Sequence, residues 1–82
     1  MAKTFFAEHT LMVPASPPHP EGTQYKVSLG MEDWGGAHRR VIKVQMTYGG
    51  AVSGRKSPSY PLDADDYYQV YKAVRRLVRE HV

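Results

Sequence analysis

Several residue types that could perform catalysis occur in this 82-residue chain, but none stands at a spacing that catalysis needs. The four histidines lack the spacing of metal ligands and have no cysteine beside them, so we expect no metal site and no cofactor. Ser53 and Ser57 have no histidine and carboxylate relay near them in the sequence. Asp63, Asp65 and Asp66 form a carboxylate cluster, but they precede a helix-forming segment, where capping is the expected role. We therefore expect that the chain is not an enzyme.

The distribution of positive charge points to binding instead. Residues 39–82 hold nine Lys and Arg against four Asp and Glu, whereas residues 1–38 hold two against four. The two halves therefore carry +5 and −2, which favours a polyanionic partner over a small-molecule substrate. Part of this charge forms a helical stripe that also fits an ordinary solvated face near a helix C-terminus: Lys72, Arg75, Arg76 and Arg79.

Alternation of apolar and polar residues predicts the strands that would position these charges. We expect three strands, over residues 4–13, 24–31 and 40–48. Residues 14–20 contain four prolines, which cannot donate backbone hydrogen bonds, so this stretch is expected to be an extended surface loop. The sequence does not indicate a role for that loop.

A helix is predicted over residues 64–80. Asp63 is the expected N-cap, and Leu62 and Tyr67 occupy the positions of a hydrophobic staple. Three-and-four spacing predicts one apolar face made of Tyr67, Val70, Tyr71, Val74, Leu77 and Val78.

A short fourth strand is expected over residues 57–62, where Pro58 and Pro61 confine it to a sheet edge or an irregular form. These elements predict an α+β fold for a single domain, residues 1–82: an antiparallel sheet of about four strands with one C-terminal helix packed on one face. A domain this small without cysteine often gains stability by association, so we expect a homodimer. No apolar run approaches the ~20 residues that span a bilayer and no secretory signal is evident, so we expect no membrane association and a cytoplasmic location.

The face of the sheet opposite the helix is the expected binding surface. Single-stranded nucleic-acid binders combine lysines that follow phosphates with aromatic rings that stack on bases. Trp34, in a glycine-containing turn, either folds over the edge of the core or projects as such a stacking platform. A polar face of this kind is also typical of any exposed antiparallel sheet. The residues expected on it are Lys26, Ser28, Lys43, Gln45 and Thr47.

Three motifs follow one another between about Gln24 and Leu77. They are the turn Asp33-Trp34-Gly35-Gly36, a long strand that ends at Tyr48, and Gly54-Arg55-Lys56 ahead of a short strand and an acidic helix start. In this order they resemble the positive cofactor four (p15) family of transcriptional coactivators. Members of that family are dimers that bind single-stranded DNA and fold as a four-stranded antiparallel sheet followed by one helix. The resemblance implies that Trp34 stacks on a base, that Arg55 and Lys56 contact phosphates, and that Tyr48 lies near the same groove.

The sequence thus predicts sequence-tolerant binding of single-stranded DNA or RNA, in transcription or replication. The alternative is a protein–protein interaction module without nucleic-acid binding, in which Tyr67, Tyr68 and Tyr71 form a dimer or partner interface. Tyr68 discriminates between the two because it lies off the apolar stripe, so its burial against a second chain alone would favour the interface. The predicted nucleic-acid site consists of Lys26, Trp34, Arg39, Arg40, Lys43, Tyr48, Arg55 and Lys56.

Overall fold

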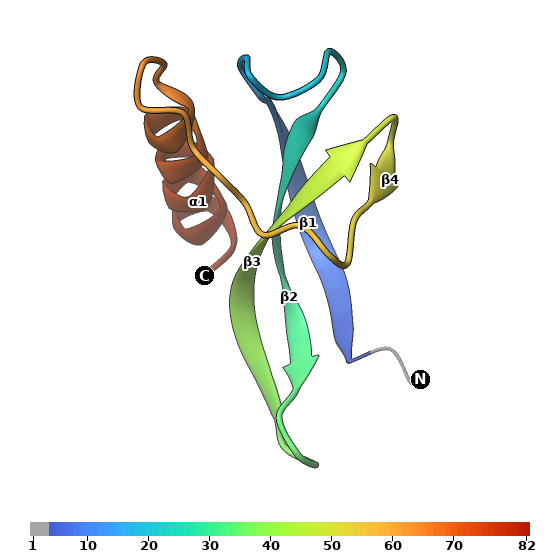
Figure 1. Ribbon diagram of the computed structural model, residues 1–82. Coiled ribbons are helices and arrows are strands. Elements are labelled where there is room, and N and C mark those ends of the chain that lie inside the picture. Colours follow the sequence, from blue (N-terminus) through green and yellow to red (C-terminus); the bar gives the residue numbers. More distant parts are fainter. Residues whose placement is uncertain (1–3) are drawn as a thin grey trace.

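The chain forms a four-stranded antiparallel sheet with the strands in sequence order, followed by a single helix that packs on one face (Figure 1). The computed structural model describes residues 4–82. The elements are β1 (Phe5–Pro14), β2 (Gln24–Asp33), β3 (His38–Tyr48), β4 (Ala51–Val52) and α1 (Asp66–His81). The predicted α+β fold is confirmed. Within residues 4–82, no helix is long and apolar enough to cross a membrane.

The core lies between α1 and the inner face of the first three strands. β2 contributes Tyr25, Val27 and Leu29 to it, all almost completely buried, as the alternation of its sequence predicts. The helix packs on β1 and β2 and covers the inner face of β3 less completely. On β3, Ile42 and Val44 are therefore only partly buried against the same core.

The pairing of β1 with β2 contains an irregularity between Ala7 and His9, where β1 gains one residue. Gly30 lies opposite Ala7 at this point. A Cβ atom on Gly30 would lie 2.2 Å from the carbonyl oxygen of Phe6, so only glycine fits there. This close approach lets β1 and β2 remain paired on both sides of the irregularity.

The predicted fourth strand at residues 57–62 is wrong, since this segment has no strand, and the fourth strand is the two-residue β4. Gly49 and Gly50 both adopt positive φ, 60° and 86°, and form the two-residue turn between β3 and β4. The prolines of residues 57–62 cannot donate to a ladder, and the segment instead crosses back toward α1 (Figure 1). On the way, the ring of Tyr60 stacks on that of Tyr25 with centroids 5.1 Å apart.

The start of α1 also differs from the prediction. The helix begins at Asp66 rather than at residue 64, and its N-cap is Asp65 rather than Asp63, without a side-chain capping bond. Leu62 is 87% exposed, so it forms no staple with Tyr67. The buried face is narrower than the predicted stripe and consists of Asp66, Val70, Ala73 and Leu77.

Candidate nucleic-acid interface

Three of the predicted cations share the outer face of the sheet, on the side away from α1 (Figure 1). The antiparallel register places Lys26 opposite Gln45, Lys43 opposite Ser28 and Arg39 opposite Glu32. Directly opposed residues in an antiparallel pair point to the same face, so the three cations and Glu32 lie together. We call Lys26, Arg39 and Lys43 the outer-face cations.

The outer-face cations differ in how they are paired. The Lys43 ammonium bonds the Glu32 carboxylate and lies 5.1 Å from the centre of the Phe5 ring. Within residues 4–82, neither Lys26 nor Arg39 has an ion-pair partner. Because one acid faces three cations on the β2 and β3 part of this face, the surface is positively charged.

Two polar residues expected on this surface are used internally instead. The hydroxyls of Ser28 and Thr10 are 3.1 Å apart, within hydrogen-bonding distance, and the Thr47 hydroxyl donates to the carbonyl oxygen of Gln24 at 3.1 Å. Both Ser28 and Thr47 are buried. Binding at the outer face is therefore left to the longer side chains, which include the outer-face cations and Gln45.

Trp34 projects from the tip of the β2–β3 hairpin. Its side chain is 59% exposed, which excludes the expectation that it folds over the edge of the core. The turn is held because Trp34 N donates to Ala37 O and Gly36 N donates to the Asp33 carboxylate, each at 2.8 Å. The indole is therefore exposed at the hairpin tip, next to the end of the outer face where Arg39 lies.

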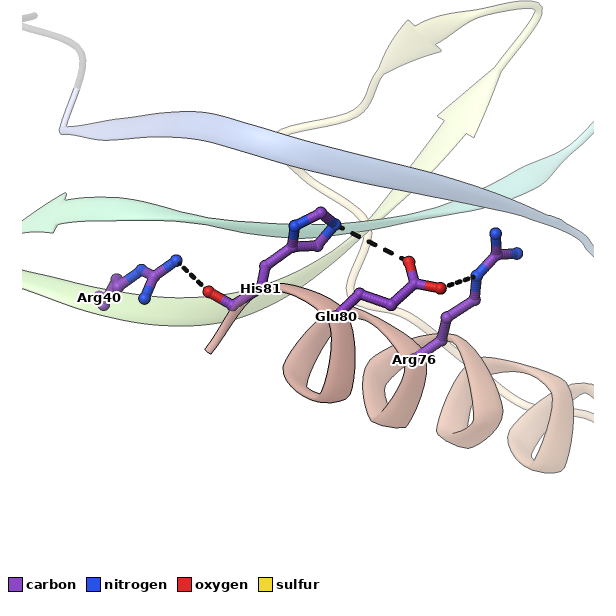
Figure 2. A network of polar contacts seen from close by, with 4 residues as sticks. All are labelled: Arg40, Arg76, Glu80 and His81. Atoms are coloured by element: carbon purple, nitrogen blue, oxygen red, sulfur yellow. Dashed lines mark hydrogen bonds and ion pairs between the residues drawn. The ribbon is translucent and has the colours of Figure 1, made fainter.

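Arg40 does not belong to this surface, contrary to the prediction. Its guanidinium donates to the carbonyl oxygen of His81 at 2.9 Å (Figure 2). It also pairs with Glu8 at 3.5 Å. The His81 ring stacks on that of His9 with centroids 3.6 Å apart. Arg40 alternates with Arg39 along β3, so it faces inward and ties the end of the helix to the sheet.

Tyr48 and Lys56 lie together, but at the other end of β3 from Trp34. At ~3.3 Å per residue, the length of β3 separates the two ends by roughly 30 Å. Tyr48 and Lys56 line a cavity of about 320 Å³. Arg55 precedes this cavity in a turn where the backbone N–H groups of Arg55 and Lys56 donate to the Ser53 hydroxyl at 3.3 and 3.2 Å. The remaining residues of the cavity wall are Pro18, His19, Pro20, Ser57 and Ser59.

A buried network that the sequence did not predict holds these walls in place. Asp66, 2% exposed, accepts hydrogen bonds from the Ser16 N–H at 2.8 Å and the Tyr25 hydroxyl at 2.7 Å. The His19 Nε2–H donates to the carbonyl oxygen of Ser59 at 2.8 Å, which ties the proline-rich loop to the segment before α1. A buried tyrosine needs a hydrogen-bond partner for its hydroxyl. The inward-facing position of Tyr25 in the strand pattern was therefore the one feature of the sequence that could have indicated this network.

The network shifts the pKa of Tyr25 and that of Asp66. Burial, hydrogen bonding to Asp66 and the negative charge of Asp66 raise the pKa of Tyr25 well above its usual range. For Asp66, burial acts to raise the pKa, but hydrogen bonds from Ser16 and Tyr25 and the nearby His19 outweigh it and lower the pKa. The carboxylate therefore stays charged inside the fold and connects the proline-rich loop to α1.

Comparison of the chain with protein-family models, with curated proteins and with solved structures finds no match. The sheet followed by a helix agrees with the fold that the resemblance to the positive cofactor four family implies. The last strand, however, precedes Gly54-Arg55-Lys56 in this chain, whereas the resemblance places it after this motif. Membership of that family stays a prediction.

Proposed function

We propose that the protein binds single-stranded nucleic acid across the outer face of β2 and β3, with the strand reaching the hairpin tip. The observation that carries this proposal is that Lys26, Arg39 and Lys43 share a face that α1 does not cover, with an exposed Trp34 at its end. A row of cations attracts phosphates, and an exposed indole offers a stacking surface that an unpaired base can use. The order of motifs that resembles a single-stranded DNA-binding family adds support.

The free energy of binding comes from two sources at this surface. Phosphates that contact the outer-face cations release counterions, and stacking of a base on Trp34 contributes about 1–3 kcal/mol. Lys43 is already paired with Glu32, whose side chain is only 15% exposed and would lose its partner if Lys43 turned to a phosphate. We therefore expect Lys26 and Arg39, which have no ion-pair partner within residues 4–82, to contact phosphates first.

Titration of Trp34 fluorescence with oligo-dT, at low and moderate salt, tests the proposal. Trp34 is the only tryptophan of the chain, so its emission reports on the hairpin tip alone. The single strand is expected to quench the emission, with an affinity that falls as salt rises, while the matching duplex has little effect. Absence of quenching, together with absence of a complex in a mobility assay, would refute nucleic-acid binding.

A charge-matched pair of double variants locates the surface. K26A/R39A is expected to weaken oligo-dT binding and to reduce the salt slope by about 1.4, because each phosphate of a single strand that a cation neutralises adds about 0.7 to that slope. R75A/R79A removes the same charge from exposed positions on α1 and is the control. Equal effects of the two pairs would show that net charge, and not the outer face, determines affinity.

A second candidate function, self-association through α1, rests on a separate observation. The helix flank that holds Tyr67, Tyr71 and Val78 was expected in the core, but all three residues are exposed, and Tyr71 is 55% exposed. At 100° per residue this flank lies across the buried helix face from Gln69 and Arg76, which line a cavity with β1. It therefore lies toward β3, where Ile42 and Val44 are only partly buried. We propose a second copy of the chain as the occupant of this apolar surface.

A further inference from the structure

The cavity at the far end of β3 has the size of a small ligand site. Its volume of about 320 Å³ lies at the lower end of the range for small-molecule sites, about 300–1,000 Å³. Its apolar lining comes from the rings of Pro18, Pro20 and Tyr48. Its polar lining comes from the segment that contains Lys56, Ser57 and Ser59. We call this cavity the Tyr48–Lys56 pocket.

The polar groups around the Tyr48–Lys56 pocket are free to bind a ligand. Within residues 4–82, the Lys56 ammonium and the side-chain hydroxyls of Tyr48, Ser57 and Ser59 have no hydrogen-bond or ion-pair partner. No carboxylate is among the lining residues. Asp66 lies behind the wall, where Ser16 and Tyr25 already bond it. A cation with hydroxyl donors and no competing acid favours an anionic ligand.

The walls of the pocket are held before any ligand arrives. His19 is fixed to the Ser59 segment by its hydrogen bond to Ser59 O, and its ring packs edge to face with that of Tyr25, with centroids 5.7 Å apart. The Ser53 hydroxyl holds the turn that leads into Lys56. Binding here would cost little ordering of the chain, because the site is largely preformed.

We propose that the Tyr48–Lys56 pocket binds a single nucleotide, with the base against the rings of Tyr48, Pro18 and Pro20 and the phosphate at Lys56 and Ser57. The apolar lining suits the face of a base, and the Lys56 cation suits a phosphate, so neither inorganic phosphate nor a nucleoside alone satisfies both. This inference rests on the proposed function for its ligand class and names a mononucleotide as a second ligand. Tyr48 packs against the core, on the opposite face of β3 from Lys43 and Gln45, so the pocket is a separate site from the outer-face cations.

Titration with thymidine 5′-monophosphate, followed by amide chemical shifts of the ¹⁵N-labelled chain, tests the pocket separately from the outer face. Shifts are expected at residues 18–20, 48 and 56–59, and not at the hairpin tip. Lys56→Ala is expected to weaken the response about tenfold or more, because hydrogen bonds to a charged group contribute about 1.5–3 kcal/mol. Lys72→Ala, an exposed lysine on α1, is the control and should bind as the wild type does.

Three results would overturn the pocket proposal: no shifts with the mononucleotide, equal binding by Lys56→Ala and wild type, or equal binding of inorganic phosphate and the mononucleotide. Lys56 is exposed and its ammonium bonds no other group of residues 4–82, so Lys56→Ala is expected to keep the fold, which a thermal melt checks. Loss of the mononucleotide response alone leaves oligo-dT binding on the outer face intact. Failure of wild-type protein to bind oligo-dT instead refutes the proposed function.

Discussion

At the scale of single residues, Asp66 shows how one carboxylate can serve the whole fold. A charge at the start of a helix is usually solvated and favoured by the helix dipole. Here the carboxylate is buried, and donors from the loop before β2 and from β2 itself satisfy it. Removing a partner from a buried charged group costs more than removing a surface cap, so Asp66 is the most sensitive residue of the helix start.

The lowered pKa of Asp66 makes the free energy of unfolding depend on pH. Its contribution is present above the carboxyl's unfolded pKa, about 3.9, and is lost as pH falls through the lower folded value. Asp66→Asn is therefore expected to destabilise the protein at neutral pH by about 1.5–3 kcal/mol. The Tm of Asp66→Asn should also fall less than that of the wild type when the pH is lowered below about 4.

Thermal melts between pH 7 and pH 2 measure this dependence. Asp63→Asn makes the same charge change at an exposed position three residues earlier and is the control. If Asp66→Asn and Asp63→Asn melted alike at every pH, the buried network would not contribute to stability in the way that its hydrogen bonds indicate.

At the scale of elements, the β1–β2 pairing depends on Gly30. The extra residue of β1 brings the Phe6 carbonyl so close that no side chain fits opposite it. β1 and β2 pair on both sides of the irregularity, from Phe5 to Pro14 of β1. The pairing of these two strands through the irregularity therefore depends on one glycine.

Gly30→Ala is expected to destabilise the protein by at least the ~1–3 kcal/mol typical of overpacking, because the clash is with backbone rather than with a flexible side chain. Chemical denaturation measures the change. Gly54→Ala is a suitable control, since a Cβ there meets no atom within 4 Å. A Gly30→Ala protein as stable as the control would mean that β1 can shift away without loss of pairing.

At the scale of the whole molecule, different surfaces have different chemistry. The outer face of the sheet is basic, one flank of α1 is apolar, and the far end of β3 holds the Tyr48–Lys56 pocket. A second copy on the helix flank would leave the outer face free, because the two surfaces lie on opposite sides of the sheet. Self-association and nucleic-acid binding are therefore compatible.

Sedimentation velocity tests self-association. The wild type is expected to sediment as a dimer at micromolar concentrations, and Tyr71→Glu as a monomer, because a carboxylate on the apolar flank would be desolvated in the interface. Arg79→Gln changes the net charge equally on the solvent side of α1 and should remain dimeric. A wild type that is monomeric at all concentrations would remove the homodimer proposal.

The amino-acid sequence by itself determined the class of the fold and the character of its outer face. Alternation placed Val27 and Leu29 inward and Lys26 and Lys43 outward, since the period of a strand depends only on local backbone geometry. The spacing of Val70 and Leu77 indicated the helix for the same reason. These signals arise from neighbours in the chain, so no tertiary information was needed to recognise them.

Only the tertiary structure decided which of the predicted residues meet. The Arg40 guanidinium meets the carbonyl oxygen of His81 at the end of the helix and the carboxylate of Glu8 on β1, so it is not available to the binding surface. Residues 57–62 became a crossing segment, because the core offered Tyr60 a place on Tyr25 while the prolines could not join a ladder. Asp66 became a buried tether because Ser16 and Tyr25, 50 and 41 residues away, converge on it. Such contacts depend on distant parts of the chain, and no local pattern encodes them.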